Sequence, residues 1–258
     1  MKRTLIWGYG ITSYVIFLAT FLYAVAFVGN FGVAQTIDGV PTFPLGKALV
    51  INLGLLGIFA VQHSLMARKG FKEWWTKIVP NPAERSTYVL LSSAALLVLF
   101  HFWQPMGGII WNVQNPVAQG ILYILFALGW VLVLVSTFLI NHFDLFGLRQ
   151  VWLYFRGKEY MPLPFKTPWV YQYVRHPLYV GWLFAFWATP TMSIAHLVFA
   201  IATTLYILIA IQLEERDLVS VHGQAYSNYQ KRVPMLIPKF SRVTMSEDKE
   251  RRVGSVAV

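Results

Sequence analysis

Long apolar segments separated by short polar ones dominate the chain. Because about 20 apolar residues span the hydrocarbon core of a bilayer, each such segment predicts a transmembrane helix. Four single helices are expected at residues 5–28, 48–66, 88–103 and 117–140. A fifth segment, residues 178–213, is too long for one crossing, and Pro190 is expected to interrupt it. We predict a helical hairpin there, with one short arm and one full arm.

The composition supports this interpretation. Hydrophobic residues make up 57% of the 258 residues and charged residues only 12%, whereas soluble domains carry about 25% charged residues. An ordinary soluble enzyme and a disordered protein are therefore excluded. The chain has no cysteine, which excludes disulfides, thiolate metal sites and cysteine nucleophiles. The predicted fold class is an all-α integral membrane protein with four transmembrane helices plus a C-terminal helical hairpin. Residues 1–240 are expected to form one domain, and the small, charged residues 241–258 a disordered tail.

The charged residues indicate an orientation. Under the predicted spans, 20 of the 21 Lys and Arg residues fall on one side of the membrane, and only Lys47 falls on the other. The positive-inside rule makes that side cytoplasmic, so both termini are expected in the cytoplasm of a bacterial-type inner membrane. The net charge of +10 follows this sorting and does not indicate nucleic acid. Most acidic residues lie on the same side, which favours a water-soluble cytosolic cofactor. No obligate protein partner is inferred.

Two polar groups lie at the cytoplasmic ends of predicted spans. Gln62, His63 and Ser64 end the second span, and His142 and Asp144 follow the fourth. Polar side chains at membrane depth need partners, so contacts with neighbouring helices explain the first group as well as a functional role does. His142 and Asp144 are expected to form a hydrogen-bonded pair, which suits a general base. A helix end, with a cationic His near the terminal carbonyls, is the structural alternative.

Two further motifs flank the predicted hairpin. Before it, Pro177 favours a turn at His176 and an immediate helix start, whose free amides suit a carboxylate. Nearby tyrosines suit a cationic ligand, although an aromatic belt at the interface explains them equally well. After the hairpin, Glu214 and Glu215 end the last apolar helix. These carboxylates suit an ammonium group or ribose hydroxyls, and a salt-bridged rim is the structural alternative.

Together, these motifs resemble the isoprenylcysteine carboxyl methyltransferase and phospholipid methyltransferase superfamily. The matching pattern is an Arg-His-Pro-x-Tyr-x-Gly turn, then Glu-Glu-x-x-Leu and a Gly-x-x-Tyr-x-x-Tyr-x-x-x-Val-Pro tail. The residues that carry the match are Arg175, His176, Pro177, Tyr179, Gly181, Glu214, Glu215, Leu218, Gly223, Tyr226, Tyr229, Val233 and Pro234. With Gln62 to Ser64, Pro82 to Tyr88 and His142 to Gly147, the chain also resembles the membrane methanethiol S-methyltransferases and the related NnrU-like proteins over most of its length.

The resemblance implies S-adenosylmethionine (SAM) as methyl donor, bound by cytosolic segments. It implies cofactor-binding roles for Tyr171, His176, Tyr179 and Glu214, and less defined roles in the same motifs for Arg175, Gly181 and Glu215. The chain departs from the carboxyl methyltransferases at Ala210, where they place an arginine that handles the substrate. The missing cation weakens the case for a carboxylate substrate, and a small thiol such as methanethiol needs no such partner. No metal is expected.

A thiol acceptor must be ionised, because the thiolate is the reactive form and an ordinary thiol has a pKa of about 8.5. His142, oriented by Asp144, is the first candidate base and His63 the second. Arg85 and Arg175 are candidates for stabilising the thiolate by charge alone. Other acceptors remain alternatives, namely hydrogen sulfide, another small thiol or a lipid amine. A haem-binding NnrU-like protein is a further alternative, with axial ligands among His63, His101, His142 and His176. A transporter or receptor is disfavoured by the absence of internal repeats.

Overall fold

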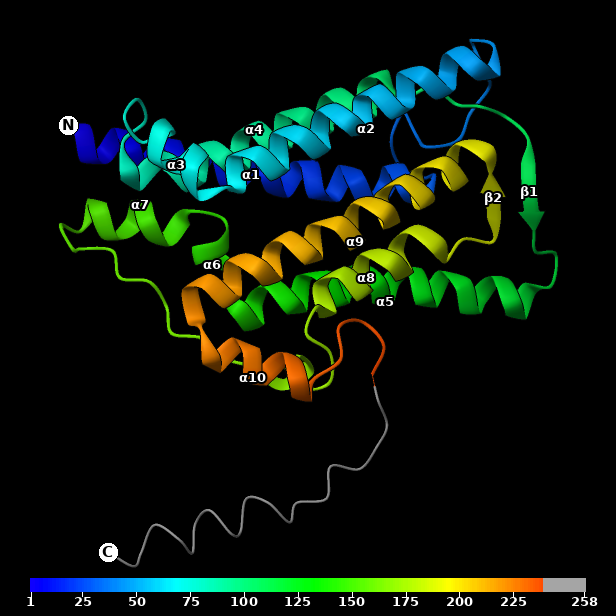
Figure 1. The fold of residues 1–258 in the computed structure, drawn as a ribbon. Helices are drawn as coiled ribbons and strands as arrows, with labels where there is room; N and C mark the ends of the chain where they lie inside the picture. The colour runs from blue at the N-terminus through cyan, green and yellow to red at the C-terminus, as the bar shows by residue number, and fades with distance from the viewer. Residues whose placement is uncertain (239–258) are drawn as a thin grey trace, which may run out of the picture.

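The structure is a computed structural model, and it describes residues 1–238 (Figure 1). Five helices of this part of the chain are long and apolar enough to cross a membrane by length and composition. They are α1 (Lys2–Gly29), α2 (Leu45–Ala67), α4 (Asn81–Phe102), α5 (Pro116–Ile140) and α9 (Ile194–His222). The predicted helical architecture, typical of an integral membrane protein, is confirmed. The number of crossings stays a prediction, and the predicted disordered tail lies outside the described residues.

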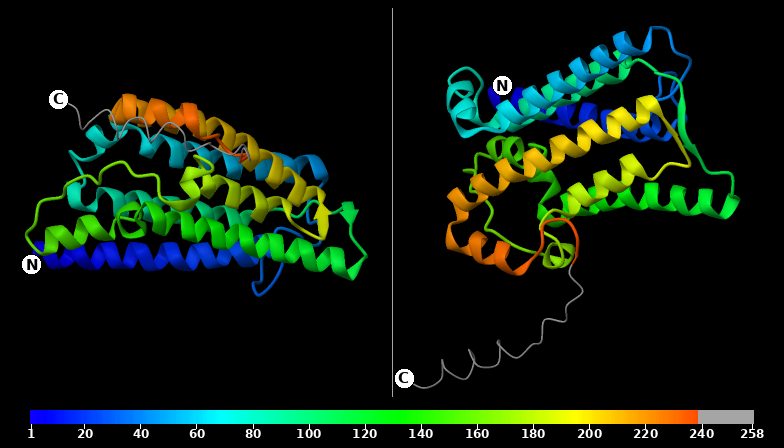
Figure 2. Two further views of the ribbon diagram at one scale, coloured as in Figure 1. Left: turned by 90° about the horizontal axis from the view of Figure 1, so that it is seen from below. Right: turned by 45° about the vertical axis from the view of Figure 1, so that its right-hand side comes forward.

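Short elements lie at the two ends of the long helices, as Figures 1 and 2 show. At one end lie the helices α3 (Lys69–Trp75), α6 (His142–Leu145), α7 (Leu148–Phe155) and α10 (Gln224–Arg232). A 3-10 turn, η1 (Trp169–Gln172), precedes α8 (Pro177–Trp187). At the opposite end, the strands β1 (Ile109–Asn112) and β2 (Thr191–Ser193) form a small sheet. The polar segments with candidate chemistry therefore gather at the end with the short helices.

The predicted break in the fifth apolar segment is confirmed. Helix α8 has 11 residues and ends at Trp187, and α9 begins after Pro190 and has 29 residues. Ser193 caps α9, because its hydroxyl accepts a hydrogen bond from the His196 amide at 3.0 Å. The structure thus contains one short and one long apolar helix where a short and a full arm were expected.

The two-stranded sheet was not predicted. The strands are antiparallel, with Ile109 opposite Ser193 and Asn112 opposite Thr191. The sheet joins the connection between α4 and α5 to the connection between α8 and α9. The Ser193 hydroxyl also donates to Asp38, in the loop after α1. Four-residue and three-residue strands next to long apolar helices leave little pattern in the sequence.

Helix α4 begins at Asn81 rather than at residue 88. Its first turns are polar, so hydropathy alone misses them, although Pro82 in the first turn is a helix-start signal. The extension matters for the site because it places Arg85 and Tyr88 on the helix that packs against α1 and α2.

Candidate functional site

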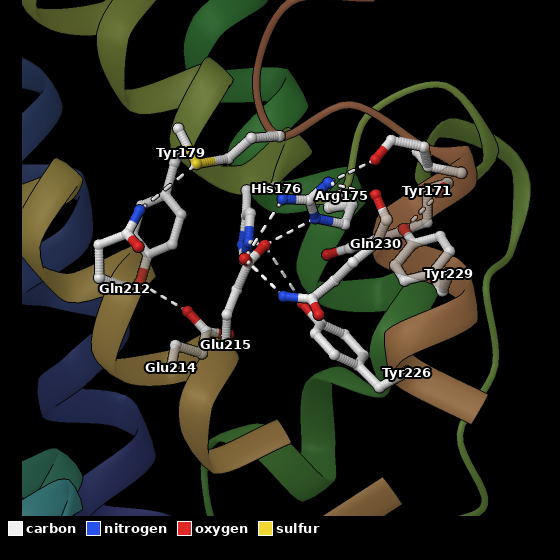
Figure 3. Close-up of polar contacts among 12 residues, drawn as sticks. Tyr171, Arg175, His176, Tyr179, Gln212, Glu214, Glu215, Tyr226, Tyr229 and Gln230 are labelled. Carbon is white, nitrogen blue, oxygen red and sulfur yellow. Dashed lines mark hydrogen bonds and ion pairs between the residues drawn. The ribbon is translucent and has the colours of Figure 1, made fainter. Parts of the chain in front are cut away.

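The Arg-His-Pro turn is held by the chain that follows α10. Pro177 occupies the first turn of α8, so His176 becomes the residue that precedes the helix, with φ −126°. The Arg175 amide donates to the Pro234 carbonyl at 2.9 Å, and the His176 amide to the Met235 carbonyl at 3.2 Å. Two motifs about 60 residues apart therefore form one unit, and its side chains meet the end of α9 (Figure 3).

Glu215 is the centre of this unit. Its buried carboxylate accepts from Arg175 Nε at 2.6 Å, from Arg175 Nη2 at 3.2 Å and from His176 Nε2 at 2.9 Å. Gln230 Nε2 donates to it at 2.8 Å and the Tyr226 hydroxyl at 3.5 Å. A buried charge is tolerated when it is paired and hydrogen-bonded, and these four residues provide that environment. Glu215 thus ties α8, α9 and α10 together and has little capacity left for a ligand.

Glu214 has a different environment although it is the next residue. Its carboxylate is half-buried and accepts one hydrogen bond among the described residues, from the Tyr179 hydroxyl at 2.9 Å (Figure 3). A carboxylate has about four acceptor sites, so most of those on Glu214 remain available. The Tyr179–Glu214 pair is therefore the part of the motif that is suited to bind hydroxyl or ammonium groups.

The tyrosines around the turn are hydrogen-bond donors. The Tyr171 hydroxyl donates to the Ser136 carbonyl at 3.4 Å, and the Tyr229 hydroxyl donates to the Tyr171 carbonyl. Burial raises the pKa of Tyr171 and Tyr226, and it raises the pKa of Tyr229 to about 12. These phenols stay protonated near neutral pH and support the turn. Tyr226 and Tyr229 carry out roles that the sequence analysis did not assign, although both belong to the tail motif.

Gly181 lies at a contact between helices. A Cβ atom at this position would lie 2.7 Å from the Gly129 carbonyl oxygen, and a Cβ at Gly129 would lie 2.6 Å from the Ala185 amide. The backbones of α5 and α8 approach so closely that neither position accepts a side chain. Gly181 therefore sets the position of α8 and has no side chain with which to contact a cofactor.

The predicted hydrogen-bonded pair of His142 and Asp144 is wrong. Asn141 has φ 148° and ends α5, so His142 begins a separate turn and its imidazole points back toward α1 and α5. Its Nε2 lies 2.8 Å from the Tyr14 hydroxyl, and its Nδ1 lies 2.8 Å from the Thr137 hydroxyl. Burial lowers the pKa of His142. The ring is 3% exposed, and its nitrogens have protein partners.

Asp144 belongs to another cluster. It accepts from Arg149 Nη1 at 2.8 Å and from the Tyr160 hydroxyl at 3.3 Å. Burial and the neighbouring Asp144 raise the pKa of Tyr160. This cluster joins α6, α7 and the chain after α7. Neither Arg149 nor Tyr160 was singled out from the sequence, because an ion pair between adjacent short helices has no motif.

The other two predicted catalytic residues lie together between α2 and α4. The Tyr88 hydroxyl is 2.9 Å from His63 Nε2, and the Ser92 hydroxyl is 3.2 Å from His63 Nδ1. The Arg85 guanidinium lies over the Tyr88 ring, 5.6 Å from its centre. The next residue of α2, Ser64, contacts a different helix: its hydroxyl is 3.0 Å from the hydroxyl of Tyr206, on α9. His63 and Arg85 are thus brought together, and Tyr88 lies between them.

The four histidines considered as haem ligands are dispersed. His63, His142 and His176 are hydrogen-bonded to side chains in three different places, and His101 is exposed on α4. Within residues 1–238, no three His, Cys, Asp or Glu residues are grouped as a metal site requires. In the described part of the chain, the four histidines therefore do not share one site.

Proteins of known name are similar to two thirds or more of the chain. Methanethiol S-methyltransferase from Crocosphaera subtropica is 63% identical, over 92% of this chain and 93% of that protein. Methanethiol S-methyltransferase from Mycobacterium tuberculosis is 54% identical, over 92% and 98% respectively. Nurim from Xenopus laevis is 33% identical, over 67% and 64%. No family model and no solved structure matches the chain.

Proposed function

The chain belongs to the methanethiol S-methyltransferase family, and we propose that it transfers a methyl group from SAM to methanethiol, forming dimethyl sulfide. The observation that carries the proposal is the similarity over nine-tenths of the chain to proteins with this name. It includes both candidate clusters, because the Tyr179–Glu214 pair and the His63–Tyr88 pair lie within the compared length.

The Tyr179–Glu214 pair is the proposed donor site. Glu214 is half-buried and has spare acceptor capacity, which fits the ribose hydroxyls or the ammonium group of SAM. Tyr179 orients the carboxylate, and the Arg175–Glu215 ion pair holds the turn beneath it. When bound, SAM supplies a methyl group activated on a sulfonium. The protein must then exclude water and hold the acceptor sulfur in line with that methyl group.

The proposed acceptor is a small uncharged thiol that enters through lipid. Ala210 supplies no cation for a carboxylate substrate. Two of the candidate cations and bases already have protein partners, since Arg175 is bound to Glu215 and His142 to Tyr14 and Thr137. His63 also has partners, Tyr88 and Ser92, but these lie next to Arg85, so we assign activation of the thiol to the His63 and Arg85 pair. We place the reaction on the cytosolic side of a bacterial-type inner membrane, with both termini in the cytoplasm, on the basis of the sorting of basic residues.

Headspace gas chromatography tests this proposal. Purified full-length protein is incubated in a sealed vial with SAM and methanethiol, and dimethyl sulfide is measured. We expect product that requires both compounds and that falls strongly in a Glu214→Gln variant. Parallel vials with hydrogen sulfide, or with an amine-containing phospholipid, compare the alternative acceptors. Absence of dimethyl sulfide together with methylation of another acceptor would contradict the proposal.

A further inference from the structure

We propose that His63, Tyr88 and Tyr206 form the acceptor-thiol subsite, in which Tyr88 relays the thiol proton to His63. This inference rests on the proposed function and states where methanethiol would bind. The three side chains come from α2, α4 and α9. Tyr88 pairs with His63, and Tyr206 pairs with Ser64, the residue that follows His63 on α2. The subsite therefore lies where these three helices meet.

The subsite adjoins the proposed donor site. Tyr206, which contacts Ser64 of α2, lies on the same helix as Glu214, the partner of Tyr179, and eight residues, about 12 Å, before it. In the proposal, an acceptor held near Tyr88 and Tyr206 meets the methyl group of a donor held at Tyr179 and Glu214. The cluster of His142 has no such connection, because its imidazole is enclosed by Tyr14, Thr137 and an aromatic wall.

The surroundings of His63 and Tyr88 suit a small thiol, which has an apolar methyl group and one polar sulfur. His63 and Tyr88 are both half-buried, and their polar groups pair between α2 and α4. Phe59 stacks on the His63 ring, with centres 5.2 Å apart, and forms an apolar wall. The Arg85 guanidinium places a positive charge 5.6 Å from the centre of the Tyr88 ring. A thiolate formed there would be stabilised by that charge.

The hydrogen bonds define a path for the proton. The Tyr88 hydroxyl lies 2.9 Å from His63 Nε2 and 3.1 Å from Nδ1, and in the tautomer in which Nδ1 donates to Ser92 it is Nε2 that accepts from Tyr88. The S–H bond of the thiol breaks and its electron pair stays on sulfur, while the proton passes to the Tyr88 oxygen and the Tyr88 proton passes to His63 Nε2. The thiolate is then the nucleophile, and His63 later returns the proton to water. Tyr88 is the group that touches the thiol, and Ser92 is a positioning residue.

Several charged groups surround His63 and contribute to the pH dependence of this step. Arg85 acts on it directly, and Arg85, Glu84 and Arg68 act electrostatically on Tyr88. The ionisable residues around the subsite are Arg68, Lys72, Glu84, Arg85, Tyr88, Tyr179, Tyr206, Glu214 and Asp217. Comparing variants with the parent at each pH removes the contributions that these groups make to both proteins.

The first experiment removes the base or the relay. We expect His63→Gln to lower kcat/KM for methanethiol by 10²- to 10⁴-fold near neutral pH, the range for a lost base. Tyr88→Phe, which keeps the ring, should lower it as well. The affinity for SAM, measured by calorimetry, should stay unchanged in both variants. Controls are His101→Gln and Tyr123→Phe, which change exposed residues of α4 and α5.

A more acidic thiol separates proton removal from a structural effect. A trifluorinated ethanethiol is ionised without help near neutral pH, so His63→Gln should methylate it nearly as well as the parent does. The defect with methanethiol should also shrink as the pH rises. An equal defect with both thiols at every pH, or unchanged kcat/KM in both variants, would overturn the relay.

A second experiment tests access to the subsite without measuring turnover. The chain has no cysteine, so Ser64→Cys introduces a single thiol next to Tyr206. Methyl methanethiosulfonate transfers a methylthio group of the size of the substrate, and mass spectrometry detects the addition. We expect labelling at Ser64→Cys and none at Ser13→Cys, whose site on α1 is fully buried.

The outcomes separate this inference from the proposed function. If the parent makes no dimethyl sulfide, the proposed function fails, whereas labelling at Ser64→Cys still reports whether a small sulfur compound reaches the cluster. If the parent is active, but Ser64→Cys stays unlabelled and the His63 and Tyr88 variants keep full activity, the subsite is wrong and the proposed function stands.

Discussion

Glu214 and Glu215 are adjacent on α9, but their carboxylates have different partners. Glu215 is buried and accepts from Arg175, His176, Gln230 and Tyr226, whereas Glu214 accepts only from Tyr179 within the described chain. Successive residues of a helix point about 100° apart, so Glu215 faces α10 and the turn before α8, and Glu214 faces Tyr179 on α8. A motif that looks like a pair of equivalent acids is therefore divided into a structural residue and a candidate ligand.

Glu215→Gln should destabilise the protein. The amide leaves the buried guanidinium of Arg175 without a counter-charge, and breaking a buried ion pair costs about 3–5 kcal/mol. We expect a clear fall in the melting temperature measured in detergent, together with loss of SAM binding as the turn loosens. An unchanged melting temperature would contradict the structural role.

Glu214→Gln should weaken SAM binding without destabilising the protein. Its site is half-buried and has one neutral partner, so folding should be little affected. A charge-assisted hydrogen bond contributes about 1.5–3 kcal/mol, so the affinity for SAM should fall roughly 10- to 100-fold. Calorimetry on the folded variant measures this. Full affinity would remove Glu214 from the donor site.

Gly181→Ala should push α8 away from α5. The new methyl group would lie 2.7 Å from the Gly129 carbonyl oxygen, which is backbone and cannot move alone. Overpacking of this kind costs about 1–3 kcal/mol, and the displaced α8 carries Tyr179, so both stability and SAM affinity should fall. Gly120→Ala is the matched control on α5, because a Cβ there meets nothing within 4 Å. That variant should be as stable as the parent or slightly more stable.

The sequence predicted the helices because hydropathy and length determine them. It also predicted the break at Pro190 and the helix start at Pro177, since proline acts locally. It missed the first turns of α4, which are polar, and the short strands β1 and β2. The strands depend on contacts between distant segments, which periodicity does not record, whereas the polar start of α4 lies outside the apolar pattern that hydropathy follows.

The candidate site was predicted as a set of residues but not as an arrangement. Tyr179 and Glu214 were both named, yet only the packing of α8 on α9 shows that they meet. The expected pair of His142 and Asp144 fails because both lie in the helical turn α6, where side chains two residues apart do not face each other. That turn begins at Asn141, which leaves α5 with φ 148°. Such a φ value at a non-glycine residue cannot be derived from composition or spacing.

His142→Gln tests whether the first candidate base has a structural role. The His142 ring nitrogens are bound to Tyr14 and Thr137, and a glutamine amide also offers one acceptor and donors. We expect turnover and SAM affinity within a few fold of the parent, with some loss of stability. A loss of turnover at unchanged SAM affinity, recovered at higher pH, would instead return His142 to the mechanism.

The same residue should make stability depend on pH. Burial lowers the pKa of His142 from its usual value of about 6.5, so between the two values the unfolded chain binds more protons than the folded one. The stabilisation is complete above about pH 6.5 and is lost as the pH falls below it. Glutamine does not titrate. The melting temperature of the parent, relative to that of His142→Gln, should therefore decrease as the pH is lowered from about 8 to about 5, the range in which an imidazole changes its charge. All other residues are the same in both proteins, so the difference isolates His142. A difference that stays constant or grows toward pH 5 would mean that the folded state holds this imidazole in its charged form.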